Sequence, residues 1–445
     1  MDTAALIEET FRAEHGRVLG ALIGALGDFD LAEDALQEAL VTALERWPRE
    51  GQPRNPAGWM VTVARRKAID RLRRDKAFVR RHNALAAEAA GGAAAAVNPA
   101  HLDDAAVEAA IPDERLKLIF TCCHPALAPE AQIALILRAL GGLSTAEIAH
   151  AFLTPVPTMN QRLTRAKHKI RSAGIPFQTP TAEARPARLS VVLHVLYLIF
   201  NEGYAATTGE ALIRHELCAE AIALARVLVE LLHDSTGDEP EALGLLALML
   251  LHDSRRAARV DAAGDLVLLE DQDRSRWDAA AIAEGLALLE RALRLRQPGP
   301  YQLQAAISAL HTQAQTSAET AWAQIATLYG ELERHAPSPV VRLNRAVAVG
   351  MAQGPLAGLM RLDQLRLDEA LDNYHWYHAA RADLLRRAGY ADEARAAYGR
   401  ALALCRNGVE RGYLERRVRQ LGEVKAILGD DDRPTTKDQR RTTDD

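Results

Sequence analysis

The fold is decided by residues 143–172, which read LSTAEIAHAFLTPVPTMNQRLTRAKHKIRS. Near its start, Ser144 is followed three positions later by Glu147, a capping-box pattern that predicts the beginning of a helix. A turn is predicted at Leu153–Pro155, and a second helix is expected over Thr158–Arg171. Two helices joined by a turn of about three or four residues are typical of a helix-turn-helix motif.

The second helix is strongly basic. Between Pro157 and Ser172 the sequence has five basic residues and no acidic residue. Its apolar residues Met159, Leu163 and Ile170 would attach it to its own domain. Polar residues in the first turn can hydrogen-bond base edges, and flanking Lys and Arg can contact phosphates. This pattern favours a DNA-recognition helix over a solvated basic helix. The candidate DNA-binding residues are Thr158, Asn160, Gln161, Arg162, Arg165, Lys167, Lys169 and Arg171.

Two blocks of opposite charge precede this motif. Residues 28–50 contain seven acidic residues and two Arg, whereas residues 65–81 contain nine basic and two acidic residues. Such separation predicts two partners, one cationic and one anionic. The acidic block suits a basic protein surface, because DNA would repel it. Its polar stripe consists of Glu33, Asp34, Gln37 and Glu38. The opposite side of this helix is expected to be filled by Leu31, Ala35, Leu36, Leu40 and Leu44.

The basic block follows Trp59 and a short apolar run. An aromatic ring and cations on one element can stack with an unpaired base while they neutralise phosphates. A single Trp at helical spacing is equally consistent with a core residue, and the charge run with a solvated face. The residues alone leave these interpretations open.

The rest of the chain is also expected to be helical, because Ala and Leu recur at helical spacing and alternating β-branched runs are nearly absent. Residues 377–404 are the clearest helical hairpin, with the small, glycine and aromatic positions of a tetratricopeptide unit. Residues 303–332 and 340–362 resemble weaker copies. The spacing of 34 residues from Ala346 to Ala380 matches that repeat.

One segment, residues 265–277, interrupts this helical pattern and carries several charged residues. Together with residues near position 202 it could form a ligand or contact site. The same residues could equally cap helices and seal a hairpin. The candidate residues are Asn201, Glu202, Tyr204, Asp271, Asp273, Arg274 and Trp277.

We expect no catalytic residue, no metal site and no cofactor. Cys122 and Cys123 lack a second ligand pair, which favours structural thiols, and no Walker-type or G-x-S-x-G motif occurs. Hydrophobic residues make up 49% and charged residues 25% of the 445 residues, as in ordinary globular proteins. Four cysteines, no signal-peptide pattern and no apolar run of membrane-spanning length predict a soluble cytoplasmic protein without membrane contact.

Four segments in this order resemble those of a bacterial extracytoplasmic-function RNA polymerase sigma factor of the sigma-70 family. The segments are Asp34–Glu38, Trp59–Arg74, Leu143–Ala149 and Thr158–Lys167. The whole chain is also similar to a subgroup of these factors with a C-terminal extension of tetratricopeptide character. The stretches that carry this second resemblance are Ile119–Leu127, Leu198–Tyr204, Leu269–Trp277 and Tyr374–Asp383.

The resemblance implies two partners, core RNA polymerase and promoter DNA. The stripe Glu33, Asp34, Gln37 and Glu38 would bind the β′ clamp helices of the polymerase. The helix over residues 158–171 would read the −35 promoter element through the candidate DNA-binding residues given above. The −10 element would be bound by Gly51, Arg54, Asn55, Trp59, Arg65, Arg66, Lys67, Arg71, Arg73 and Arg74.

The resulting expectation is an all-α chain with two small sigma domains and a tetratricopeptide-like extension. The expected divisions are region 2 over 1–81, a flexible linker over 82–107, region 4 over 108–175, the extension over 176–429 and a disordered tail over 430–445. Such a factor would bind polymerase and direct promoter recognition, melting and initiation, regulated by its extension, which could contact the sigma domains. The alternative is a one-component helix-turn-helix regulator with a ligand-sensing repeat domain, which would bind duplex DNA tightly without polymerase.

Overall fold

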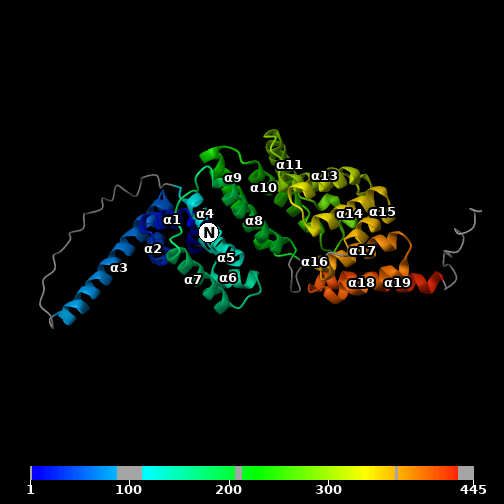
Figure 1. The fold of residues 1–445 in the computed structure, drawn as a ribbon. Coiled ribbons are helices and arrows are strands. Elements are labelled where there is room, and N and C mark those ends of the chain that lie inside the picture. Colours follow the sequence, from blue (N-terminus) through cyan, green and yellow to red (C-terminus); the bar gives the residue numbers. More distant parts are fainter. Residues whose placement is uncertain (1–2, 88–112, 206–212, 366–368, 429–445) are drawn as a thin grey trace, which may run out of the picture. The chain divides into compact units, whose positions relative to one another are not determined.

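The computed structural model describes residues 3–87, 113–205, 213–365 and 369–428 (Figure 1). Within these ranges all regular elements are helices, and the only β-type pairing is an isolated bridge between Val260 and Leu266. The predicted all-α fold is confirmed. The chain forms two compact units, Met1–Ile199 with Ala223–Gly237 and Phe200–Ile222 with Asp238–Asp445.

The first unit begins with three helices that pack on one another: α1 (Thr3–Leu26), α2 (Phe29–Glu50) and α3 (Pro56–Ala87). Asp28 caps the start of α2 by accepting a hydrogen bond from the amide of Leu31. Gly51 ends this helix with φ at +84°, a conformation that favours glycine. The predicted linker starts inside α3, whose last residues are 82–87, and residues 88–107 lie outside the described residues, as does the predicted tail.

Four shorter helices follow: α4 (Arg115–Cys122), α5 (Pro129–Ala139), α6 (Thr145–Ala151) and α7 (Val156–Ser172). The capping box at the start of α6 is confirmed. The Ser144 amide donates to the Glu147 carboxylate at 2.7 Å, and the Glu147 amide donates to the Ser144 hydroxyl at 3.2 Å. A tight turn at Leu153, with φ at +47°, leads into α7. The predicted helix-turn-helix is therefore present.

Helices α8 (Arg185–Tyr204) and α9 (His215–Thr236) contribute residues to both units. The chain after Ile175 remains packed against the first unit. The Thr121 hydroxyl donates to the carbonyl of Pro176, and the ring of Phe177 lies against Gly24 of α1. A cut directly after the region 4 helices would therefore remove part of this unit's packing.

The second unit is built from consecutive helices, many of which pair with the next helix along the chain. They are α10 (Pro240–Asp253), α11 (Ala279–Arg294), α12 (Pro300–Gln313), α13 (Trp322–His335), α14 (Pro339–Gln353), α15 (Pro355–Gln364), α16 (Glu369–Asp372), α17 (His375–Arg387), α18 (Ala391–Leu404) and α19 (Gly408–Leu428). Proline at the first position starts four of them, where its missing amide hydrogen costs nothing. A Cβ on Gly358 would lie 2.8 Å from the Cα of Gly350, so α14 and α15 cross closely.

The predicted interruption at residues 265–277 lies between α10 and α11. The segment between these two helices holds the isolated bridge and three short 3-10 turns, η2 (Arg256–Ala258), η3 (Leu269–Asp271) and η4 (Arg274–Arg276). Asp273 caps η4 by accepting from the amide of Ser275. Asp278 caps α11 by accepting from the amides of Ala280 and Ala281. Short polar side chains thus organise a segment that has no helical ladder of its own.

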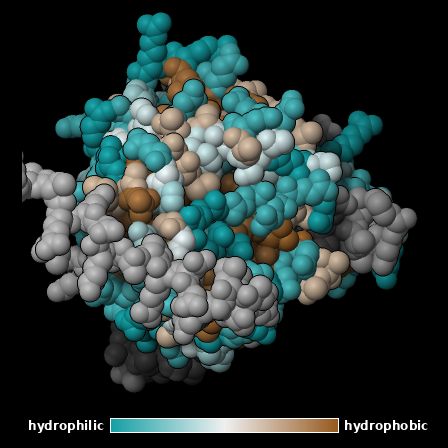
Figure 2. Space-filling view, turned by 90° about the vertical axis from the view of Figure 1, so that its right-hand side faces the viewer, coloured by the Kyte–Doolittle hydropathy of each residue, from teal (hydrophilic) through white to brown (hydrophobic). Residues whose placement is uncertain are grey.

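No helix within the described ranges combines the length and the apolar character needed to cross a membrane. The face of the molecule in Figure 2 is mostly hydrophilic, and its hydrophobic residues form small separate areas.

Candidate functional site

The second helix of the helix-turn-helix, α7, has polar side chains on its exposed face and apolar side chains on its buried face. Met159, Leu163 and Ile170 of α7 are buried, as their spacing predicted, and Ala166 is buried with them. Of the predicted DNA-binding residues of α7, six are exposed to solvent: Thr158, Asn160, Gln161, Arg165, Lys169 and Arg171. Arg162 is half-buried. The side chains expected to read base edges are therefore accessible on one helix.

The C-terminal half of α7 is joined to the start of α2 by ion pairs. Nζ of Lys167 lies 2.8 Å from Oε2 of Glu33 and 3.1 Å from Oδ1 of Asp30. The side chains of Lys167 and Glu33 are only 14% and 15% exposed. Arg171 pairs with Asp30 at 2.9 Å and with Asp28 at 3.1 Å. Lys167, a predicted DNA-binding cation, thus pairs with Glu33, a predicted polymerase-binding acid, and Arg171 pairs with two further acids, Asp28 and Asp30.

The charges at this contact stabilise one another. Burial opposes ionisation of Asp30, but the hydrogen bonds and charges of Lys167 and Arg171 outweigh it and hold the pKa of this carboxyl below its usual value. Burial also opposes the charge of Lys167, and the acids Glu33 and Asp30 reverse that effect and raise the pKa of its ammonium group. Asp30 and Lys167 are therefore both charged at neutral pH.

The exposed face of α2 carries the rest of the predicted polymerase-binding stripe. Asp34 and Gln37 are exposed, and Glu38 is half-buried. Val41 and Leu44 continue this face and are 56% and 45% exposed. The expectation that Leu44 packs in the core was wrong, because the periodicity does not show how far a partner helix covers it. Sequence reasoning missed these two apolar residues as part of a surface beside the acids.

The basic surface of α3 is largely open. Arg65, Arg66, Arg73 and Arg74 are exposed and Lys67 is half-buried. Arg71 pairs with Asp34 at 2.6 Å, so the predicted −10 and polymerase surfaces meet at that point. Exposed pairs of this kind contribute roughly 0–1 kcal/mol and break readily.

The predicted −10 residues before this block also have local structural roles. Half-buried Trp59 packs edge-to-face on buried Trp47, with ring centroids 5.3 Å apart. Asn55 caps α3 by accepting a hydrogen bond from the amide of Gly58 at 2.9 Å. Gly51 ends α2, and Arg54 is exposed. Of this group, Arg54 and the accessible part of Trp59 are best placed to meet a base.

In the second unit, Tyr204 and Trp277 each contact arginines. The guanidinium of Arg259 lies 3.6 Å from the Tyr204 ring centroid, and Arg255 donates to the Tyr204 hydroxyl at 2.9 Å. The guanidinium of Arg274 lies 4.5 Å from the ring centroid of buried Trp277, with Arg255 at 6.0 Å. The predicted contact residues Tyr204, Arg274 and Trp277 thus belong to one cluster. Of the other candidates, Glu202 pairs with Arg214 at 2.8 Å, Asp273 caps η4, Asn201 is half-buried and Asp271 is exposed.

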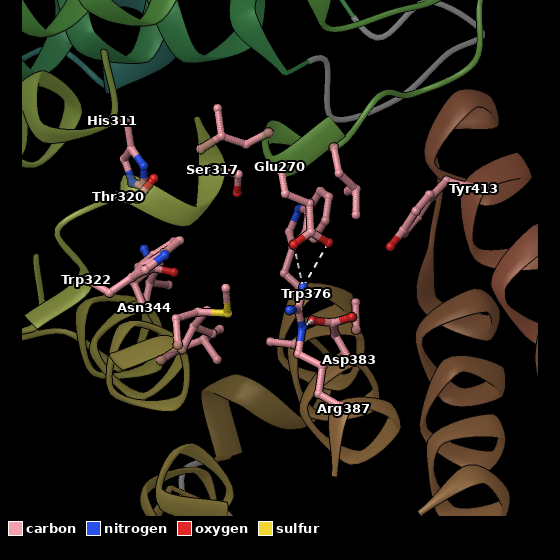
Figure 3. A pocket seen from close by; sticks show the side chains of 18 of the residues that line it. Glu270, His311, Ser317, Thr320, Trp322, Asn344, Trp376, Asp383, Arg387 and Tyr413 are labelled. Atoms are coloured by element: carbon pink, nitrogen blue, oxygen red, sulfur yellow. Dashed lines mark hydrogen bonds and ion pairs between the residues drawn. The ribbon is translucent and has the colours of Figure 1, made fainter. Parts of the chain in front are cut away.

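A cavity of about 480 Å³ lies in the second unit (Figure 3). Its polar lining residues are Glu270, Arg274, His311, Ser317, Thr320, Asn344, Asp383 and Arg387. Its aromatic lining residues are Trp322, Tyr374, Trp376, Tyr398 and Tyr413, and aliphatic side chains of η3, α14 and α17 complete the wall. Sequence reasoning identified only Arg274 among these residues, because the lining comes from segments spread over residues 268–413.

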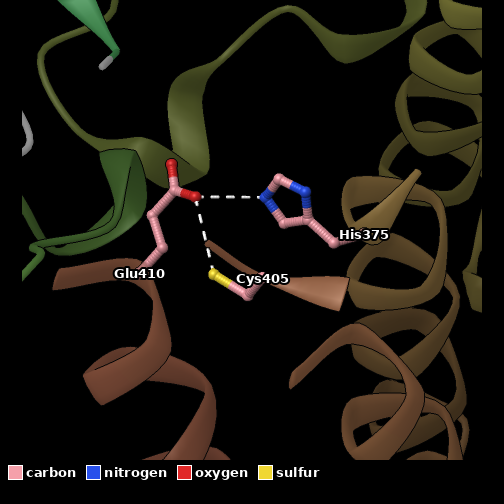
Figure 4. A group of neighbouring side chains, drawn as sticks. All are labelled: His375, Cys405 and Glu410. Carbon is pink, nitrogen blue, oxygen red and sulfur yellow. Dashed lines mark hydrogen bonds and ion pairs between the residues drawn. The ribbon is translucent and has the colours of Figure 1, made fainter. Parts of the chain in front are cut away.

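Three potential metal ligands also meet in the second unit (Figure 4). Nε2 of His375 lies 3.1 Å from Oε2 of Glu410, and Sγ of Cys405 lies 3.9 Å from the same oxygen. Nitrogen, sulfur and oxygen donors suit a borderline-soft divalent ion such as zinc. The same contacts also tie the start of α17 to the start of α19 without an ion. These three residues follow no metal-binding spacing motif, so sequence reasoning did not predict the group.

Three thiols lie outside this group. Cys122, Cys123 and Cys218 are fully buried, and burial raises the pKa of each thiol. A protonated, inaccessible thiol is a poor nucleophile and a poor metal ligand. This environment agrees with the expectation of structural thiols at Cys122, the last residue of α4, and Cys123, its C-cap.

Comparison with known proteins identifies the domains that this geometry suggests. Residues 10–78 match sigma-70 region 2 and residues 117–170 match sigma-70 region 4. Residues 188–293 match a family of unknown function, DUF6596. The chain thus has the domains of a sigma factor, which imply core RNA polymerase and promoter DNA as partners. The tetratricopeptide character expected of the extension stays a prediction.

The chain belongs to the same family as the uncharacterized protein R00370 of Rhizobium meliloti (strain 1021). The two are 45% identical over 424 residues, which cover 94% of this chain and 96% of that protein. The chain is also similar to the ECF RNA polymerase sigma factor SigK of Mycobacterium ulcerans (strain Agy99), with 29% identity over 161 residues, 35% of this chain and 79% of that protein. No solved structure matches.

Proposed function

We propose that this chain is an RNA polymerase sigma factor that directs promoter recognition, melting and initiation and is regulated by its own C-terminal extension. The observation that carries the proposal is the presence, in one unit, of a capped helix-turn-helix whose second helix is basic and free of acids and of a helix with an exposed acidic and apolar face. One surface suits DNA and the other suits a basic protein.

The first turn of α7 enters the major groove at the −35 element. Thr158, Asn160 and Gln161 are exposed there and can exchange hydrogen bonds with base edges. Arg165 and Lys169 lie further along the helix and contact phosphates, which position the helix without reading sequence. The exposed arginines of α3 hold the −10 DNA in the same way, and binding energy from phosphates and captured bases drives strand opening.

The ion pairs between α7 and α2 define a closed arrangement of the two sigma domains. Lys167 and Glu33 cover each other at 2.8 Å, whereas Arg171 stays 57% exposed but has its charge already paired with Asp28 and Asp30. Phosphates can replace these carboxylates as partners of the cations, and a basic polymerase surface can replace the cations as partners of the acids. Assembly with polymerase and promoter therefore separates α7 from α2.

Binding to a labelled promoter duplex, with and without purified core RNA polymerase, tests this proposal. We expect weak binding by the chain alone and tight, sequence-specific binding with polymerase. Arg165→Ala should weaken the ternary complex about tenfold, whereas Arg400→Ala, which removes an exposed cation of α18, should leave it unchanged. Tight binding by the chain alone would instead identify a one-component regulator.

A further inference from the structure

The cavity of the second unit has the size and lining of a small-molecule site. Its volume of about 480 Å³ lies within the range of roughly 300–1,000 Å³ found for ligand pockets. Trp322, Trp376 and Met351 give it a broad apolar wall. Flat aromatic walls of this kind favour a planar or aliphatic ligand body.

The two carboxylates in the wall are already neutralised. Glu270 and Asp383 each lie 2.6 Å from Arg387, as the dashed lines in Figure 3 show, and Asp383 also pairs with Arg386 at 2.6 Å. This group contains two acids and two guanidinium ions. It leaves no surplus negative charge that would select a cationic ligand.

Arg274 also lines the cavity, but it is held by different partners from those of Arg387. Its guanidinium donates to the carbonyl oxygens of His311 at 2.6 Å and Ala314 at 2.8 Å and contacts the ring of Trp277. Within the described residues no carboxylate lies within ion-pair distance of it, although Glu319 acts on it through space. Arg274 is therefore a half-buried cation held by neutral groups.

Two neighbouring arginines are also held by neutral groups. Arg255 donates to the hydroxyl of Tyr204, and Arg259 donates to its backbone carbonyl, and neither has a carboxylate partner within the described part of the chain. Burial and the charges of Arg255 and Arg274 lower the pKa of His311 to about 4, so this imidazole is neutral at pH 7. Its buried Nδ1 has no hydrogen-bond partner in the described structure. Positive charge thus accumulates beside the His311 side of the cavity, and an anion there would relieve the cost of unpaired cations.

We propose that this cavity binds a small organic acid, with its carboxylate at Arg274 and its apolar or aromatic body against Trp322, Trp376 and Met351. A bound carboxylate gives Arg274 the charged partner that the protein does not supply. The pocket wall includes the segment that interrupts the helices between α10 and α11, so a ligand would bridge η3 and η4 to α12, α13, α14 and α17. This site is separate from the DNA and polymerase surfaces and does not depend on the proposed function.

Calorimetric titration of the full chain with two matched probes tests the proposal. Indole-3-acetate carries the carboxylate, and indole-3-acetamide has nearly the same shape without the charge. We expect saturable binding of both, with the acetate at least about tenfold tighter, the typical advantage of a charge-assisted contact. Arg274→Met should abolish this tenfold preference, whereas Arg276→Met, an exposed arginine of the same 3-10 turn, should keep it.

Arg274 also donates to carbonyls at the end of α12, so its replacement could alter the local structure. A second variant separates such a structural effect from the loss of the ligand contact. Ala380→Phe fills the cavity and leaves every charge in place, and it should weaken both probes about tenfold or more. The comparison of the two probes on the unaltered chain needs no variant at all. Equal affinities for both probes, no saturable binding of either, or the same loss in Arg276→Met would overturn the proposal.

Discussion

Lys167 and Glu33, which stand 134 positions apart in the sequence, meet with 2.8 Å between Nζ and Oε2. Lys167 belongs to the helix expected to bind DNA and Glu33 to the helix expected to bind polymerase. Under the proposed function, this contact makes DNA binding and polymerase binding mutually dependent, because neither surface is fully available until the pair separates.

Loosening the contact between α7 and α2 should expose the cations of α7. The double variant Asp28→Asn, Asp30→Asn removes both acids that hold Arg171 but keeps an N-cap for α2, since Asn caps as well as Asp. We expect affinity for a promoter duplex to rise about threefold, in line with the small free energy of exposed ion pairs. Fluorescence anisotropy at fixed salt measures it. Asp363→Asn, which breaks the pair with Arg381 in the second unit, is the control and should change nothing.

The exposed apolar residues of α2 should contribute to polymerase binding. Leu44→Ser removes one of them from a surface position, so we expect the free energy of unfolding to change by no more than about 0.5 kcal/mol. Affinity for core polymerase should fall about tenfold, because apolar residues inside an interface contribute more than rim charges. Leu293→Ser, at a 51% exposed position of α11, is the matched control. Equal polymerase affinities for the two variants would exclude Leu44 from the interface.

The capping box at Ser144 should stabilise α6, the first helix of the helix-turn-helix. Ser144→Ala removes the acceptor for the Glu147 amide and should destabilise α6 by about 1 kcal/mol. Hydrogen exchange of the α6 amides should then be about fivefold faster, and Ser144→Asp should restore the protection. Unchanged exchange in Ser144→Ala would mean that packing alone holds this helix.

The junction of α1 and α5 should be sensitive to acid. His15 is buried and its ring nitrogen lies 3.2 Å from the carbonyl of Ala139. Burial and the nearby charge of Arg138 lower its pKa from 6.5 to about 4. Between these two values the unfolded chain binds more protons than the folded chain, so stability falls as the pH drops below 6.5. The loss at pH 5 is about 2 kcal/mol.

Hydrogen exchange of α1 and α5 at pH 7 and pH 5, corrected for intrinsic rates, measures this effect locally. His15→Gln cannot titrate and should remove that part of the pH dependence while it keeps a hydrogen-bond donor. If wild type and His15→Gln lose protection equally at pH 5, the imidazole is not the source.

The features that the sequence predicts well are local. Ser144 and Glu147 lie within one helical turn, and the buried positions Met159 and Leu163 follow from spacing alone. The prediction for Leu44 failed because exposure depends on a partner helix that spacing does not describe.

Contacts between residues far apart in the sequence could not be predicted for the same reason. Nothing near Lys167 reveals that its carboxylate partner is Glu33. The pocket and the group of His375, Cys405 and Glu410 draw on helices whose mutual placement only the folded chain defines. The interruption at residues 265–277 was visible as a break in periodicity, but its role as a pocket wall was not.

Run-off transcription with purified core RNA polymerase and this chain tests the central claim most directly. On a template that carries a cognate promoter, adding the full chain should produce a transcript with one defined start, and Arg162→Ala with Arg165→Ala should reduce it strongly. Transcription that stays at the level of core polymerase alone, on every fragment of a genomic template library and over a range of salt concentrations, would contradict the account.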